Sequence, residues 1–109
     1  MMRFFHISIV WGGPVKLPDQ LKPIFDLASD WITYGGGNYI IYTSEDVFTW
    51  QGRISAIIGP EDTFLLCEIS NIENSGGWLA KWIWDWIRKP RENILNYGML
   101  PPLTTPTLK

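Results

Sequence analysis

The sequence predicts an α+β protein, and three observations support this class. Four stretches alternate apolar and polar residues, or are apolar throughout, as strands do. Two stretches with helical spacing lie between them, and glycine and proline separate the segments. The resulting βαββαβ order predicts a ferredoxin-like fold, in which right-handed crossovers give an antiparallel four-stranded sheet with two helices on one face. We assign residues 1–70 to this domain, 71–90 to a linker and a tryptophan-rich helix, and 91–109 to an extended tail.

The first βα unit spans residues 4–28. Residues 4–11 form a predicted strand that directs Phe5, Ile7 and Ile9 to one face, and Gly12-Gly13-Pro14 ends it. Helical spacing then relates five apolar residues: Leu17, Leu21, Ile24, Phe25 and Ala28. Pro23 interrupts this run, so the helix either begins near Lys22 or kinks.

A hairpin and the second helix follow. Residues 31–34 and 39–43 flank the turn Gly35-Gly36-Gly37-Asn38. Ser44-Glu45-Asp46 supplies capping side chains for a helix, and Gly59-Pro60 stops it. The buried stripe of this helix is predicted to contain Val47, Trp50, Ile54, Ile57 and Ile58.

Residues 62–69 form the last predicted strand, which is apolar on both faces. Phe64 and Leu66 point opposite to Leu65, Cys67 and Ile69. A sheet with helices on one face only leaves its second face to be covered by something else. We therefore predict that the tryptophan-rich helix or another subunit covers it, and we take Phe64 and Leu66 as partner-binding residues.

The tryptophan-rich helix is expected over residues 78–89, between Gly76-Gly77 and Pro90. Its apolar arc is wider than a surface helix needs. We expect Trp86 to face the core and Trp82 to follow it from one edge. Trp84 lies at the opposite edge and Trp78 lies outside the arc, so we predict that these two bind a partner. The alternative is that a loop or the tail covers them.

Composition restricts the function. The net charge is −2 and the sequence pI is about 5.2, so there is no general basic field for nucleic acid. The single cysteine forms no internal disulfide, which fits a reducing compartment. Neither a membrane-length apolar run nor a signal-peptide pattern occurs. We expect a cytoplasmic protein without a membrane span.

Few motifs indicate chemistry. Gly12 and Gly13 follow a strand and precede a helix, a setting that can hold phosphate, although a plain turn is favoured. His6 is the only histidine and is interpreted as a strand residue. Cys67 is interpreted as a core residue. The sequence therefore suggests no catalytic residues, no metal ligands and no cofactor.

One local basic cluster lies near the tryptophans. Cations interleaved with aromatic side chains can hold phosphates and stack bases. The possible phosphate-binding residues are Gly12, Gly13, Lys81, Arg88 and Lys89. Asp85 and Glu92 dilute the cluster, and a solvated helix edge is the favoured interpretation.

The order of elements, the hairpin strand Tyr39-Ile40-Ile41-Tyr42-Thr43, the helix end Ile57-Ile58-Gly59 and the acid-started strand 61–69 resemble one group of small proteins. This group comprises the SinR-like, VapD-like and CRISPR-associated adaptation proteins, and the resemblance covers roughly residues 3–70. It implies homodimers formed through the sheet and a C-terminal segment, and in some members a metal-dependent nuclease. The nuclease members carry an aspartate after the first strand, where this chain has Val10-Trp11-Gly12-Gly13.

We therefore favour a non-enzymatic module that binds protein, as a homodimer or as a subunit of a complex. One alternative is a metal-dependent nuclease of the resembling family with displaced ligands. The other is a nucleotide or oligonucleotide binder. Magnesium-dependent cleavage of RNA or DNA distinguishes the first alternative, and a tryptophan fluorescence change with nucleotides distinguishes the second.

Overall fold

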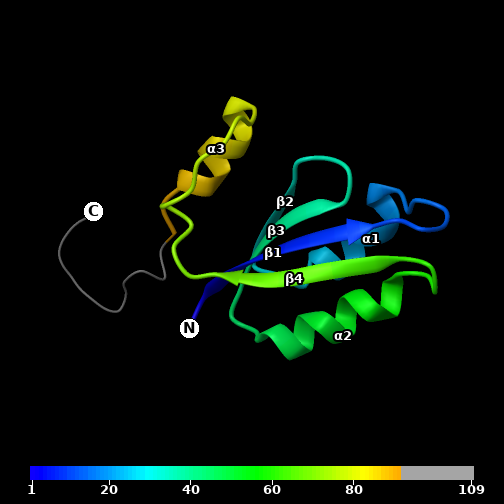
Figure 1. Ribbon diagram of the computed structural model, residues 1–109. Coiled ribbons are helices and arrows are strands. Elements are labelled where there is room, and N and C mark those ends of the chain that lie inside the picture. Colours follow the sequence, from blue (N-terminus) through cyan, green and yellow to red (C-terminus); the bar gives the residue numbers. More distant parts are fainter. Residues whose placement is uncertain (92–109) are drawn as a thin grey trace. The chain divides into compact units, whose positions relative to one another are not determined.

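A computed structural model describes residues 1–91 and shows an α+β arrangement (Figure 1). The chain divides into two compact units, Met1–Trp78 and a second that begins at Leu79. The first unit contains β1 (Arg3–Val10), α1 (Pro18–Phe25), β2 (Asp30–Thr33), β3 (Asn38–Thr43), α2 (Val47–Ile57) and β4 (Thr63–Ile69). The second contains α3 (Lys81–Arg88). The tail was predicted at 91–109, and from residue 92 onward it lies outside the described residues.

The sheet has four strands in the order β2-β3-β1-β4, and every neighbouring pair is antiparallel. This order is compatible with a ferredoxin-like fold. The two inner strands are β3 and β1, and both neighbours of β1 are distant from it in sequence. Within the described residues, β2 and β4 each have a neighbouring strand on one side only.

The core lies on the sheet face that the alternation in β1 predicted. Phe5, Ile7 and Ile9 are at most 5% exposed. Their face carries Tyr39 and Ile41 of β3, and the cluster is completed from the two helices by Leu21, Phe25, Trp50 and Ile54. Full burial of each such large apolar side chain contributes about 1.5–3 kcal/mol relative to exposure. This cluster holds α1 and α2 against the same face of the sheet.

Helix α1 begins at Pro18 and continues through Pro23, so of the two predicted alternatives the start near Lys22 does not occur. Pro18 occupies the first turn, where a missing N–H costs nothing, and the N–H of Leu17 donates to Oε1 of Gln20 at 2.7 Å. Pro23 lies inside the helix, and the next turn still closes through the Asp26 N–H and the Lys22 carbonyl at 2.8 Å. The alternative of a start near Lys22 was therefore wrong, because a proline pre-set for the first turn lies four residues upstream.

The hairpin between β2 and β3 confirms the prediction for residues 31–43. Gly35 and Gly36 have φ of +109° and +66°, which favour glycine. Gly37 is needed for a different reason. A Cβ there would lie 2.2 Å from the Ile9 carbonyl oxygen, whose residue also donates its N–H to the Gly37 carbonyl at 2.8 Å. The turn thereby fixes the hairpin against the end of β1.

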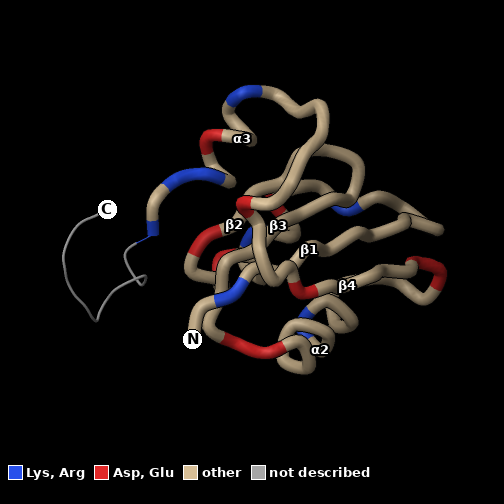
Figure 2. Tube along the Cα trace, turned by 60° about the vertical axis from the view of Figure 1, so that its left-hand side comes forward, with Lys and Arg blue, Asp and Glu red and all other residues tan. Residues whose placement is uncertain are grey.

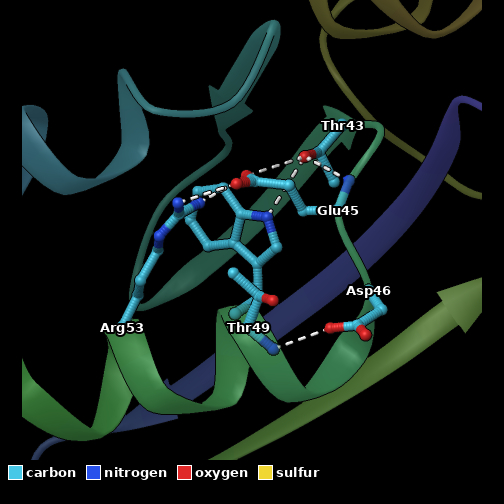
Figure 3. Close-up of polar contacts among 6 residues, drawn as sticks. Thr43, Glu45, Asp46, Thr49 and Arg53 are labelled. Carbon is cyan, nitrogen blue, oxygen red and sulfur yellow. Dashed lines mark hydrogen bonds and ion pairs between the residues drawn. The ribbon is translucent and has the colours of Figure 1, made fainter.

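A polar network fastens the start of α2 to the end of β3 (Figure 3). Asp46 caps the helix by accepting the Thr49 N–H at 2.9 Å. Arg53 forms a bidentate pair with Glu45, with Nη1–Oε1 and Nη2–Oε2 distances of 2.5 and 2.8 Å, and this pair lowers the pKa of Glu45. The Thr43 hydroxyl, which is buried, accepts the indole N–H of Trp50 at 3.2 Å. The Arg53–Glu45 pair of this network lies on the flank of α2 that faces β3.

Candidate interaction surfaces

The sheet face opposite the core is apolar at its centre and at one edge. Ile32, Ile40 and Tyr42 are buried there. Towards β4, by contrast, Val10 and Leu65 are 63% and 64% exposed. The register pairs Ser8 with Leu65 and Val10 with Thr63, so Val10 and Leu65 are diagonal neighbours. We call Val10, Leu65 and Cys67 the outer β4 patch.

Phe64 and Leu66 do not belong to this patch. Both are half-buried and pack against the core cluster on the helix side of the sheet. The outward-facing residues of β4 are the alternating set that includes Leu65 and Cys67. The sequence showed that both faces of β4 are apolar. It did not show which set the helices cover, because that depends on the register with β1.

Cys67 is exposed, so its interpretation as a core residue was wrong. It lies directly opposite His6 in the β1–β4 register. The Nε2 of His6 is hydrogen-bonded to the Tyr34 hydroxyl at 2.5 Å, and partial burial lowers the pKa of His6. The His6 imidazole of β1 and the Tyr34 hydroxyl of the hairpin thus lie on the same outward face as the Cys67 thiol. The sequence did not indicate this arrangement, because the register of β4 with β1 decides which residues of β4 lie on the face of His6.

The backbone N–H groups of Gly12 and Gly13 bind an anionic group, the side chain of Asp62. Their N–H groups donate to Oδ1 of Asp62 at 2.8 and 3.2 Å, and the Gly59 N–H donates to Oδ2 at 2.7 Å. These bonds, that from Gly59 above all, lower the pKa of Asp62. The predicted phosphate cradle therefore holds an internal carboxylate, which joins the end of β1 to the start of β4. Both oxygens of this aspartate are engaged by backbone donors.

The same site explains the glycine that follows β1. A Cβ at Gly12 would lie 1.9 Å from the Glu61 carbonyl oxygen. No side chain fits at that distance unless the backbone moves. The hydrogen bonds from the two glycine N–H groups to the Asp62 carboxylate join the two segments at this close approach.

In the second unit, α3 is shorter than predicted. It begins at Lys81, where Ala80 provides no capping side chain, and ends at Arg88 before Pro90. Ile83 and Ile87 are buried, and Trp84 and Trp86 are half-buried. Trp82 is 57% exposed, so the expectation that it follows Trp86 inward was wrong. The buried arc is centred on the two isoleucines, and Trp82 falls outside it.

Cations lie over two of the half-buried indoles. The Arg88 Cζ is 4.7 Å from the Trp84 ring centroid, and the Arg91 Cζ is 4.6 Å from that of Trp86. Trp78, the last residue of the first unit, is fully exposed. The predicted partner-binding pair is therefore divided: Trp78 is exposed, and Trp84 is half-buried beneath an arginine. Trp82 was predicted to face the core, but its indole is exposed.

The predicted phosphate-binding residues are not assembled into one described site. Gly12 and Gly13 belong to the first unit and donate to Asp62. Lys81, Arg88 and Lys89 belong to the second unit. There, Lys81 pairs with Asp85 at 2.8 Å, and Arg88 lies over Trp84. Figure 2 shows acidic and basic residues interspersed along the chain.

Residues 1–91 lack two features that would indicate a function. In this part of the chain, no three His, Cys, Asp or Glu side chains are grouped so that they could share a metal ion. None of its helices combines the length and apolar character that crossing a membrane requires. No family model, curated protein or solved structure matches the chain.

Proposed function

We propose that this protein is a non-enzymatic module that binds protein, as a homodimer or as a subunit of a complex. It would work through the exposed tryptophans and the outer β4 patch. The strand order supports the accompanying proposal of a ferredoxin-like fold. The kinship with SinR-like, VapD-like and CRISPR-associated proteins is kept as a hypothesis about its origin.

The exposure of large apolar side chains carries this proposal. Trp78 is 100% exposed and Trp82 57% exposed, and Val10 and Leu65 each expose more than 60% of their surface. Tryptophan is enriched among the residues that contribute most to the free energy of protein binding. Its burial by a partner removes a large apolar area from water, which stabilises the complex. In the proposed module, Trp82 replaces Trp84 as a partner-binding residue. Leu65 likewise replaces Phe64 and Leu66.

The test combines sedimentation with capture from the native host. The double variant Trp78→Ala, Trp82→Ala is compared with wild type, and Leu27→Ala, at a residue that is 53% exposed, is the control. We expect wild type to exceed the mass of one chain at micromolar concentration or to capture a host protein. The double variant should lose at least one of these associations, and the control should keep both.

Two outcomes would contradict the proposal. The first is a one-chain mass at every concentration, together with capture that is the same for wild type and the double variant. The second is cleavage of RNA or DNA that requires magnesium or manganese and disappears on replacement of Asp19, Asp62 or Glu68. The second outcome would establish the nuclease alternative.

A further inference from the structure

We propose that a second copy of this chain docks along the edge of β4, which has no neighbouring strand within residues 1–91, and along the adjacent flank of α2. The two β4 strands would pair antiparallel across a two-fold axis and extend the sheet. The inference rests on the proposed function only in treating the chain as a homodimer. It leaves the exposed tryptophans available for another partner.

The two edges of the sheet differ in a way that selects β4. At the other edge, β2 has four residues and begins with an aspartate, Asp30. By contrast, β4 has seven residues, TFLLCEI, with neither proline, glycine nor a basic residue. Natural edge strands are usually protected from pairing by shortness, proline, bulges or charged side chains. The β4 strand carries one charge, Glu68, near its end, and this carboxylate is paired with Arg3 of the same chain. The rest of the strand lacks these protections, so its backbone groups are suited to pairing with another strand.

The single charge on β4 favours a second copy in an antiparallel orientation. Glu68 already lies 3.7 Å from Arg3 of its own chain. In an antiparallel pair centred on Leu66, the middle residue of β4, the two copies of Glu68 lie at opposite ends and face Phe64 of the other copy. An in-register parallel pair would place the two carboxylates opposite each other, which is destabilising. The strand is therefore compatible with its own two-fold image.

The same pairing joins the outer β4 patches of the two copies. Leu65 of one chain lies opposite Cys67 of the second copy, and Thr63 lies opposite Ile69 of the second copy. Leu65 and Cys67 are both exposed in the single chain. A two-fold contact uses the same surface twice, so this apolar patch is covered by its own equivalent.

Helix α2 lies along β4 and adds a second contact (Figure 1). Arg53 is its only charged residue, and that side chain is held by Glu45 on the flank facing β3. The helical period places Gln51, Ser55 and Phe48 on the opposite flank, towards β4. These residues are exposed and uncharged, and Phe48 is 77% exposed. A solvated helix usually carries charges on its exposed face, so this flank is suited to contact with another copy.

The test uses hydrogen exchange at β4 over a series of protein concentrations. Antiparallel strands alternate in which residues bond to a given neighbour, so part of the β4 amides face the open edge in the single chain. Pairing would protect those amides as the concentration rises. We expect this increase at β4 and none at β2, which lies at the other edge.

Two matched variants test the α2 contact. Ser55→Glu and Ala56→Glu place the same charge at successive exposed positions of α2. The helical period puts Ser55 on the β4 flank and Ala56 towards the Arg53 flank. We expect Ser55→Glu to weaken dimerisation at least about tenfold, a free-energy change of about 1.4 kcal/mol, and to remove the protection of β4. Ala56→Glu should leave both unchanged. Circular dichroism of dilute samples confirms that both variants fold.

The possible failures are distinguishable. A dimer by sedimentation whose β4 amides show no concentration-dependent protection would overturn this inference and leave the proposed function standing. Equal weakening by both variants would overturn the assignment of the α2 flank. A one-chain mass at every concentration would overturn the homodimer itself, while capture of a host protein through the exposed tryptophans would still support the proposed module.

Discussion

Replacement of Trp50 by alanine should be the most damaging single change in the first unit. This residue on α2 is 0% exposed and belongs to the core cluster. Its ring centroid lies 6.4 Å from that of Phe25, and its indole N–H donates to the buried Thr43 hydroxyl at 3.2 Å. Arg53 lies over the ring at 4.8 Å. The substitution therefore removes core volume, a hydrogen bond and a cation–π contact together.

The magnitude follows from these contacts. Truncation of a buried tryptophan to alanine costs about 3–5 kcal/mol through lost burial and the cavity that remains. The Thr43 hydroxyl still accepts the Glu45 N–H at 3.2 Å, so it does not become an unsatisfied buried group. Small domains have about 5–15 kcal/mol of stability in total. Since 1 kcal/mol shifts the melting temperature by about 4–8 °C, the expected shift is about 12–40 °C.

The assay is urea and thermal unfolding followed by far-ultraviolet circular dichroism, because the other tryptophans complicate fluorescence. Trp82→Ala is the control, since that side chain is 57% exposed and should cost less than about 1 kcal/mol. A Trp50→Ala protein that unfolds within about 1 kcal/mol of wild type would refute the argument that α2 is anchored through this ring. Equal losses for Trp50→Ala and Trp82→Ala would refute the assignment of their burial.

Two further predictions concern the backbone and the internal carboxylate. Gly12→Ala should destabilise the protein, because its Cβ would lie 1.9 Å from the Glu61 carbonyl oxygen. Gly52→Ala should instead stabilise α2 by about 0.8–1 kcal/mol, because the added Cβ meets open space. Urea unfolding of the two variants measures both effects, and a Gly12→Ala protein as stable as wild type would contradict the close approach. The folded-state pKa of Asp62 lies below its ordinary value of 3.8, so the stability it contributes is present above that pH and is lost as the pH falls through the lower folded-state pKa. Asp62→Asn should therefore be less stable than wild type at neutral pH and should lose less stability on acidification. The remaining acid dependence would come from Asp26, Asp46 and Glu45, whose pKa values are also lowered. If Asp62→Asn lost as much unfolding free energy as wild type on acidification, the Asp62 carboxylate would not be stabilised by the three backbone N–H groups.

The sequence by itself determined the elements that depend on local physics. Alternation along β1 identified Phe5, Ile7 and Ile9 as the buried set, and all three are at most 5% exposed. The glycine run gave the hairpin, because positive φ values suit glycine. Asp46 gave the start of α2, because a short acceptor side chain caps the first turn. Each of these depends on residues that are close in the chain.

Only the tertiary structure decided the features that depend on register and on distant residues. It placed Leu65 and Cys67 outward and Phe64 and Leu66 inward, because the pairing of β4 with β1 fixes which parity faces the helices. It brought Asp62 onto the N–H groups of Gly12 and Gly13, some fifty residues away in sequence. It also left Trp82 exposed, whereas Ile83 and Ile87 of the same helix are buried. An apolar arc in a sequence shows how much surface a helix offers for burial. Which part of that arc is buried depends on what packs against it, and local periodicity carries no information about that.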